Sequence, residues 1–453
     1  MEPIHWLFEQ HPFLMYQVFS VPFAFLFYGL SREGYLSLAN RHVFLALGGC
    51  ALAVVSMGVY SLLLFASTGV FLLQVCSLSP AHVHPWVFGV QMSWQTVWHL
   101  YMQYREYYLN ETTNIRFLLS VSSLMLITQR MSSVSMDIQE GRVRMPSRPA
   151  PLGRAWALLS LLSYMFSFTT LLGGPLQSYH QFVCCVEQID RSPPPHPLRV
   201  VSLKGGQVFS LECLRSFLTR LLRASAGELP RCSVLGGVVW AWGLALALRT
   251  RYYSHWKVSE CLNNAAGFGF RGTGTENSLT SWSGLSDGDL LTTEMSCRVS
   301  VFARRWNATT AAWLRRQVFD RCRTSPIMMT FGFSILWHGL HPGQFVGFLI
   351  WASAVKADHL IHPHLKTRLT STWRKLWYAG LGWMHTQIVI TCVVIAVELR
   401  SFSSLRFLYV TYIGVFPFLF TLLCIGGNAV ESLLGFHGQL LDSRPLRCTP
   451  NMT

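Results

Sequence analysis

Two polar side chains able to take part in proton transfer or carbonyl binding stand in an otherwise apolar part of the chain. Asn307 lies in the basic segment Arg304-Arg-Trp-Asn-Ala-Thr-Thr-Ala-Ala-Trp-Leu-Arg-Arg316, and His338 follows the apolar run Phe331-Gly-Phe-Ser-Ile-Leu-Trp337. A neutral imidazole can take a proton from a hydroxyl near pH 7. A carboxamide offers a hydrogen-bond donor and an acceptor, so it can hold a carbonyl or a developing oxyanion. The two residue types therefore allow general-base catalysis and the binding of a carbonyl or an oxyanion.

Asn307 also has a non-catalytic interpretation. The tripeptide Asn307-Ala-Thr309 matches an N-glycosylation sequon, and Trp306 and the neighbouring arginines are typical of helices anchored at a membrane edge. We expect residues 304–316 to form one helix, with Arg305, Arg315 and Arg316 near one face. Loop charge places this segment on the cytosolic side, where glycans are not attached, so we favour the catalytic interpretation.

His338 has its own alternatives, a buried and hydrogen-bonded imidazole or a residue that ends a helix. Phe331, Ser334 and His338 stand at positions i, i+3 and i+7, which places a ring, a hydroxyl and the imidazole on one helix face. An ionisable side chain within a membrane segment is costly and indicates function. His341 suggests a metal pair with His338, but a third ligand at suitable spacing is missing, so we expect no metal.

Composition indicates a membrane protein. The chain has 453 residues, of which 51% are hydrophobic and 13% charged, against about 25% charged residues in soluble domains. The net charge of +15 is carried mainly by arginines in short loops, a pattern that records membrane topology. The sequence does not show the solvated basic face that a nucleic-acid-binding protein requires, because the basic residues alternate with apolar spans. The twelve cysteines include no CxxC pair and signal neither a zinc site nor a disulfide framework.

Runs of about 18 to 25 apolar residues are needed for a helix to cross a bilayer. We expect an all-α polytopic protein with about eleven such helices, together with re-entrant or interfacial helices, enclosing a tunnel. Segment 207–224 carries four charged residues and is expected to be interfacial or re-entrant. The expected crossings, of which 68–82 and 326–340 are short, are 13–30, 42–66, 68–82, 84–103, 115–136, 154–173, 232–250, 326–340, 343–362, 378–399 and 405–426.

The basic residues in the loops also predict how the chain is oriented in the membrane. The first span lacks a basic leader and a small-residue cleavage pattern, so we expect it to be retained, with a lumenal N-terminus and a cytosolic C-terminus. Asn110 then lies in a lumenal sequon, Asn110-Glu-Thr112. If the segment 207–224 crosses the membrane, the side of the membrane assigned to every later segment is reversed. We expect the Gly-, Ser- and Thr-rich loop 267–296 to be flexible.

The chain is expected to form a single membrane domain. We divide it by sequence into N-terminal helices (1–136), middle helices and loops (137–300), the region of the two motifs (301–426) and a C-terminal tail (427–453).

The segment around Asn307, followed by Trp337-His-Gly-Leu-His-Pro-Gly343, resembles the paired motifs of the membrane-bound O-acyltransferases. In that family such an Asn and His form the active site, which implies catalytic roles for Asn307 and His338. Further stretches that carry the resemblance are Gln91-Met-Ser-Trp-Gln-Thr96, Ser122-Ser-Leu-Met-Leu-Ile-Thr-Gln-Arg130, Tyr252-Tyr-Ser-His-Trp256, Ala265-Ala-Gly-Phe-Gly269 and His385-Thr-Gln387.

The resemblance is strongest to a branch of the family that acts on a secreted peptide. It implies transfer of a medium-chain acyl group, chiefly octanoyl, from acyl-coenzyme A to a serine near the N-terminus of a prohormone, in the endoplasmic reticulum membrane. His338 is then the general base, and the arginine-rich region 298–323 suits the phosphates of coenzyme A. We expect membrane lipids around the protein, no permanently bound cofactor and no nucleic acid. The expected walls of an acyl tunnel are Arg304, Trp306, Phe331, Ser334 and Trp351.

Three alternatives remain open from the sequence. Another acyltransferase of the same family, acting on a lipid or a different secreted protein, has the same Asn307 and His338. A polytopic transporter or channel uses His338 to relay protons or to line a pore. A non-catalytic scaffold is disfavoured because both polar motif residues are present.

Overall fold

The computed structural model of the chain describes residues 12–112, 114–144, 151–227, 233–271, 281–368 and 370–398. The expected crossing 405–426 and the tail 427–453 lie outside these residues. All regular secondary structure in the described ranges is helical. The elements are α2 (Pro12–Arg32), α3 (Leu38–Met57), η1 (Gly58–Ser61), α4 (Leu62–Ser77), α5 (Pro80–Gln103), the π-helical η2 (Tyr104–Tyr108), α6 (Ile115–Gln139), α7 (Pro151–Met165), α8 (Tyr179–Gln188), α9 (Leu198–Ser225), α10 (Val234–Ala265), α11 (Leu290–Glu294), α12 (Val299–Arg305), α13 (Ala308–Gln317), η4 (Phe319–Arg321), α14 (Pro326–His338), α15 (Pro342–Arg368) and α16 (Thr372–Glu398).

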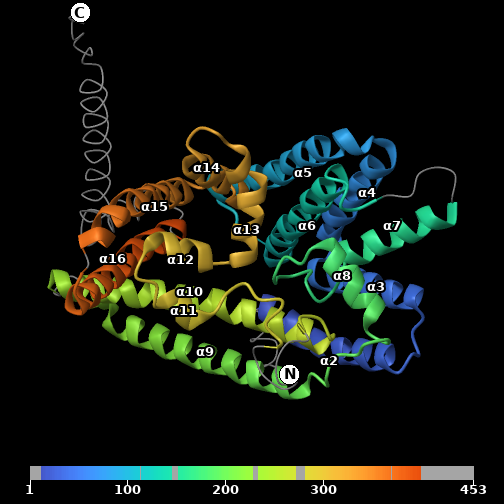
Figure 1. The fold of residues 1–453 in the computed structure, drawn as a ribbon, viewed down its shortest axis with the longest axis horizontal. Coiled ribbons are helices and arrows are strands. Elements are labelled where there is room, and N and C mark those ends of the chain that lie inside the picture. The colour runs from blue at the N-terminus through green and yellow to red at the C-terminus, as the bar shows by residue number, and fades with distance from the viewer. Residues whose placement is uncertain are drawn as a thin grey trace, which may run out of the picture.

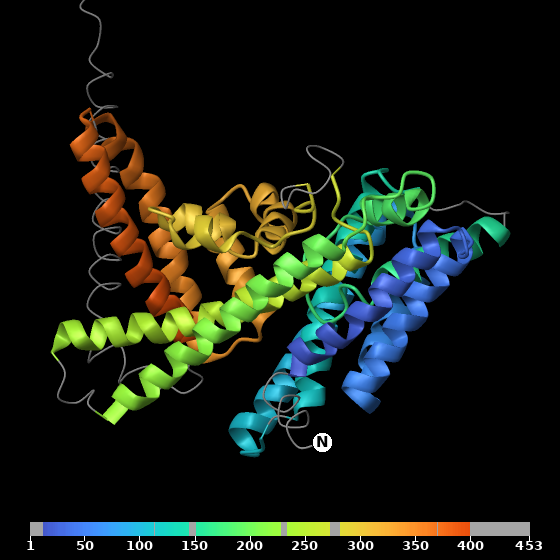
Figure 2. The same cartoon turned by 90° about the horizontal axis from the view of Figure 1, so that it is seen from below.

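Helix α10 joins two groups of helices. It packs along α9 and contacts both α2, near the start of the chain, and α16, near the end of the described residues. Helices α2 to α8 gather on one side of Figure 1, and α12 to α16 gather on the other. The same division is visible after a quarter turn in Figure 2. The motif residues Asn307 and His338 belong to the second group.

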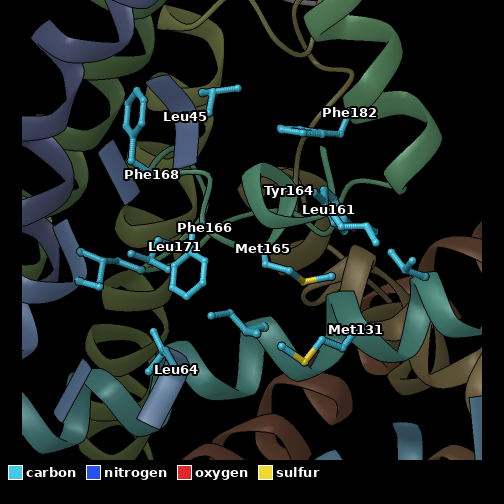
Figure 3. Close-up of a cluster of buried hydrophobic side chains, with 14 of the residues drawn as sticks. Leu45, Leu64, Met131, Leu161, Tyr164, Met165, Phe166, Phe168, Leu171 and Phe182 are labelled. Atoms are coloured by element: carbon cyan, nitrogen blue, oxygen red, sulfur yellow. The ribbon is translucent and has the colours of Figure 1, made fainter. Parts of the chain in front are cut away.

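The first group is held by a large apolar core between α2, α3, α4, α6, α7 and α8. Figure 3 shows Phe166 and Phe168, which follow α7, among the side chains of this core. Gly49 of α3 lies against this segment so closely that an added Cβ would stand 1.4 Å from the Phe166 carbonyl oxygen. A side chain larger than hydrogen therefore has no space at this position.

Four helical stretches in the described residues are long and apolar enough to cross a membrane. They are Leu14–Arg32, Leu38–Ser77, Ile115–Gln139 and Thr372–Glu398. They overlap the expected crossings 13–30, 42–66, 115–136 and 378–399, and Leu38–Ser77 also covers most of 68–82. The other expected crossings within the described residues do not meet the same requirement of length and apolarity, and they remain predictions.

Several expected boundaries were wrong. The expected crossing 42–66 is interrupted at Gly58, whose φ of 59° ends α3, because a positive φ suits glycine better than other residues. The segment 68–82 is divided where Pro80 begins α5 after an extended Ser79. The expected span 154–173 is helical only to Met165.

The polar segment 207–224 is part of the longer helix α9, which begins after Pro197. Its packing on α10 includes a buried ion pair, since Lys204 Nζ lies 3.1 Å from the Glu260 carboxylate. The helix is continuous through the segment, and Glu212 and Arg215 pair with one another along it at 2.6 Å. Its interfacial location remains a prediction.

Candidate active site

Asn307 stands at a break between two helices, which corrects the expectation of one helix over 304–316. Helix α12 ends at Arg305, Trp306 is extended, and Asn307 has left-handed backbone angles, φ 47° and ψ 61°. Asparagine tolerates this conformation better than most residues. Its Oδ1 accepts a hydrogen bond from the Thr310 backbone nitrogen at 3.4 Å and so caps α13.

Two residues after Asn307 are fixed by Asp287. The Ala308 backbone nitrogen donates to the Asp287 carbonyl oxygen at 2.7 Å, and the Thr309 hydroxyl donates to the Asp287 carboxylate. Burial raises the pKa of this carboxyl group to about 7, against the lowering effect of the Thr309 hydrogen bond, and the charge of Glu260 raises it further. Asp287 therefore binds the start of α13 with both its backbone and its side chain.

Residues of the N-terminal group of helices also bond to the start of α13. The Thr309 hydroxyl accepts from the Leu176 backbone nitrogen at 3.0 Å, and the Gln129 amide of α6 donates to the Thr310 hydroxyl at 3.3 Å. Asn307 is thereby placed where the two groups of helices meet. Its own side chain is half-buried.

Asp287 was not predicted, because it falls in the loop 267–296 that composition marks as flexible. Residues 281–296 of that loop contain α11 and the buried Trp282 and Asp287. A carboxylate among glycines and serines is an ordinary loop residue by sequence. Only its packing against Thr309 reveals its role.

His338 is the last residue of α14. Gly339 follows with a φ of 111° and ends the helix. The His338 carbonyl oxygen accepts from the Gln344 amide at 2.9 Å, while its ring, which is exposed, stacks on Phe348 of α15 with centroids 5.0 Å apart. The backbone of His338 is therefore held, and its imidazole remains accessible.

A row of aromatic rings connects the neighbourhood of Asn307 with His338. Trp306 stacks on Phe302 at a centroid distance of 5.7 Å, and Phe302 contacts Trp351 at 6.4 Å. Trp351 stacks on Phe348 at 6.3 Å, and Phe348 stacks on His338. We call these four rings, Trp306, Phe302, Trp351 and Phe348, the aromatic row. Phe302 and Phe348 are buried, and Trp306 and Trp351 are half-buried.

The structure brings together three of the five expected tunnel residues. Trp306 and Trp351 belong to the aromatic row, and Phe331 contacts Trp351 at 5.7 Å. Ser334 is buried, but its hydroxyl donates to the Thr330 carbonyl oxygen at 2.9 Å within its own helix. Arg304 is exposed in the last turn of α12. Phe348 was missed because it lies on the next helix, where no local spacing connects it to His338.

The arginines of region 298–323 differ in their surroundings. Arg298 pairs with Asp358 at 3.0 Å, and Arg316 pairs with Asp137 at 2.6 Å. Arg304, Arg321 and Arg323 are exposed. The two ion pairs join helices to one another, so Arg298 and Arg316 are engaged within the protein.

Asn110, the expected glycosylation site, is exposed directly after η2 and has a positive φ of 53°. Its side chain is thus accessible to modification. Its side of the membrane remains a prediction.

The sequence is also similar to known proteins. Residues 50–397 match the model of the membrane-bound O-acyltransferase family. The chain is 42% identical to a membrane-bound ghrelin O-acyltransferase from Rattus norvegicus, over 92% of this chain and 97% of that protein, and equally identical to the Mus musculus protein, over 92% and 96%. It is 27% identical to a membrane-bound glycerophospholipid O-acyltransferase from Homo sapiens, over 88% of this chain and 81% of that protein.

Proposed function

The chain belongs to the membrane-bound O-acyltransferase family, and we propose that it transfers an octanoyl group from octanoyl-coenzyme A to a serine hydroxyl near the N-terminus of the ghrelin prohormone. It is an acyltransferase by family. The donor, the acceptor and the catalytic residues are the parts of the proposal that require a test.

In the proposed reaction His338 takes the proton from the serine hydroxyl as the serine oxygen attacks the thioester carbonyl carbon. Asn307 donates from its amide nitrogen to the carbonyl oxygen, which carries the negative charge of the tetrahedral intermediate. When the intermediate collapses, the carbon–sulfur bond breaks. The coenzyme A thiolate leaves and takes the proton from the imidazolium, so that the ester and the free thiol are the products.

The observation that carries this proposal is the 42% identity to the ghrelin enzymes over 92% of this chain. The aromatic row is consistent with it. It joins the two polar residues by ring contacts, with His338 stacked on one end and Trp306, the neighbour of Asn307, at the other. An octanoyl chain that extends from the reacting carbonyl against the half-buried Trp306 and Trp351 buries its methylene groups, each worth about 0.8 kcal/mol. A preference for chain length then follows from the length of apolar surface available.

We further propose that the protein lies in the endoplasmic reticulum membrane with its N-terminus in the lumen and its C-terminus in the cytosol. Acyl-coenzyme A is an anionic cytosolic molecule, and a prohormone arrives from the lumen. The reaction then requires the two substrates to meet within the membrane. The exposed Arg304, Arg321 and Arg323 are candidates for binding the phosphates of the donor.

A lipid acceptor is the second candidate. It is favoured by the similarity to glycerophospholipid O-acyltransferases, whose identity of 27% is lower than the 42% found for the ghrelin enzymes but extends over most of the chain. The peptide acceptor is preferred because the similarity to the ghrelin enzymes is greater and covers nearly their whole length.

The test uses microsomes that contain the full chain, with octanoyl-coenzyme A and a short peptide that carries the ghrelin N-terminus. We expect wild type to acylate the serine and His338→Ala to lose transfer, with His82→Ala as the control for an exposed histidine elsewhere. Asn307→Asp keeps an oxygen that caps α13 but lacks the amide donor. Loss of transfer in Asn307→Asp therefore supports the proposed hydrogen bond, and transfer at the wild-type rate would exclude it.

A further inference from the structure

Four polar residues recur at every fourth position along α5 and into η2. They are Gln95, His99, Gln103 and Tyr107, which we call the α5 stripe. The spacing places successive residues near one face of the helix. Single π-helical turns such as η2 are found frequently at functional sites. Neither the proposed mechanism nor the two sequence motifs involves these side chains.

The stripe contacts the turn 338–341, which joins α14 to α15 and begins with His338. The Gln103 amide donates to the Gly339 carbonyl oxygen. The Tyr107 hydroxyl shares a hydrogen bond of 3.0 Å with Nδ1 of the buried His341, and the two rings meet edge to face. Helix α5 and η2 therefore bind the turn through two separate hydrogen bonds, one from each element.

His99 supplies a third contact with the same turn. Its side chain is 3% exposed, and a Cβ added to Gly339 would lie 2.8 Å from its Nδ1. His338 and His341 are titratable side chains that act on it electrostatically when protonated, and the Trp337 carbonyl lies close to the ring. The absence of a side chain at Gly339 is what allows the His99 ring to reach the turn.

The Gln95 amide fixes which nitrogen of His99 carries the proton. Gln95 Nε2 lies 2.8 Å from His99 Nε2 and also faces the Val121 carbonyl oxygen, so the amide nitrogen points toward both. Since Gln95 donates, His99 Nε2 accepts and the proton is on Nδ1. That Nδ1 is buried, and the Trp337 carbonyl oxygen, directly before the turn, is the backbone acceptor beside it. A buried donor is thus directed at the turn that carries the proposed base.

We propose that the α5 stripe is a positioning surface for His338, with the Nδ1–H group of His99 as its central donor. Gln103 and His99 both contact Gly339, directly after His338, and Tyr107 bonds to His341 at the end of the turn. None of the three needs to touch the substrate. Their effect is to hold the His338 imidazole where it can reach the acceptor hydroxyl, a requirement so strict that a displacement of about 1 Å can cost about 100-fold in rate. This inference rests on the proposed role of His338.

The test compares three substitutions of His99 in the full chain, with octanoyl transfer to the peptide as the assay. Asparagine can place an N–H group near the position of Nδ1, whereas glutamine places one near Nε2. We expect His99→Asn to keep kcat within about threefold of wild type and both His99→Gln and His99→Ala to lower kcat about 10- to 100-fold. The KM for octanoyl-coenzyme A should change by no more than about twofold in all three.

Gln91→Ala is the matched control. Gln91 is a buried amide on the same helix, but its side chain bonds to Ser67 of α4 and not to the turn. We expect this variant to lose thermal stability with kcat unchanged. Tyr107→Phe, which removes only the hydroxyl, should lower kcat about 10-fold.

Equal kcat values for His99→Asn and His99→Gln, or a rise in KM with kcat unchanged, would overturn the positioning role. A different outcome bears on the proposed function alone. If wild type transfers the acyl group to a lipid but not to the peptide, the proposed acceptor is wrong, and the same kcat comparison with the lipid acceptor still decides the role of the stripe. If His338→Ala retains transfer, the base is wrong and the stripe has no base to position.

Discussion

The imidazole of His338 stacks on the phenyl ring of Phe348, with centroids 5.0 Å apart and planes inclined by 25°. The two residues come from successive helices, α14 and α15, and the tight turn between these helices brings their rings together. Phe348 in turn stacks on Trp351. The orientation of the proposed base is therefore coupled to the apolar surface along which an acyl chain would lie.

Replacing Phe348 with leucine should lower the rate of acyl transfer about 10-fold, because the His338 ring loses the flat partner that limits its rotation. Phe345→Leu is the control, since Phe345 is on the same helix and 43% exposed. Transfer rates are compared at equal protein amounts. A rate for Phe348→Leu equal to that of Phe345→Leu would show that the stacking has no catalytic effect.

The hydrogen bond between Thr309 and Asp287 should contribute to stability. In Thr309→Val the buried carboxyl group loses its hydroxyl partner, which typically costs about 1–3 kcal/mol. Thr309→Ser keeps the hydroxyl and should recover most of the loss. The measurement is thermal unfolding of the detergent-solubilised protein. Equal melting temperatures for the valine and serine variants would contradict the assignment.

The same pair predicts a pH dependence of stability. Burial raises the pKa of Asp287 from 3.8 to about 7 in the folded protein. Between these values the folded state holds a proton that the unfolded state has lost. The contribution of this group to stability is thus largest at low pH and falls as pH rises toward 7.

In Asp287→Asn this contribution becomes independent of pH, and the amide oxygen can still accept from Thr309. We therefore expect the melting temperature of the variant, relative to wild type, to rise between pH 5 and pH 8. Both proteins are measured in one detergent across that range. A difference in melting temperature that stays constant with pH would mean that Asp287 titrates normally.

Gly49 should tolerate no side chain. A Cβ at this position would stand 1.4 Å from the Phe166 carbonyl oxygen, whereas a Cβ at Gly29 of α2 would meet nothing within 4 Å. Overpacking of this kind typically costs about 1–3 kcal/mol or more. Gly49→Ala should therefore yield much less folded protein than Gly29→Ala, by fluorescence-detected gel filtration. Equal yields would contradict the close packing of α3 on the segment after α7.

The sequence predicted the helical architecture and the membrane class well, because apolar runs and scarce charges depend on composition alone. The ends of helices were less well predicted where a single residue determines that a helix stops or starts. Gly58 and Pro80 divide apolar runs that hydropathy joins, and Asn307 breaks the helix that the spacing of Arg305, Arg315 and Arg316 suggested.

The candidate site was predicted in part. Asn307 and His338 were selected because their residue types are unusual within apolar surroundings, and their catalytic roles stay predictions. Their supports were not found, because Asp287, Phe348 and His99 reach the two motifs from separate segments of the chain. Sequence spacing reveals neighbours on one helix, but it does not reveal contacts that arise only when distant helices pack.

The most direct test of the proposed function is a competition between acceptors. Purified protein in lipid is given octanoyl-coenzyme A, a peptide with the ghrelin N-terminus and a lysophospholipid at equal concentration, and the products are identified by mass spectrometry. We predict octanoyl ester on the peptide serine, absent from a peptide with alanine at that position and absent with His338→Ala. Octanoyl transfer to the lysophospholipid in place of the peptide would contradict the account.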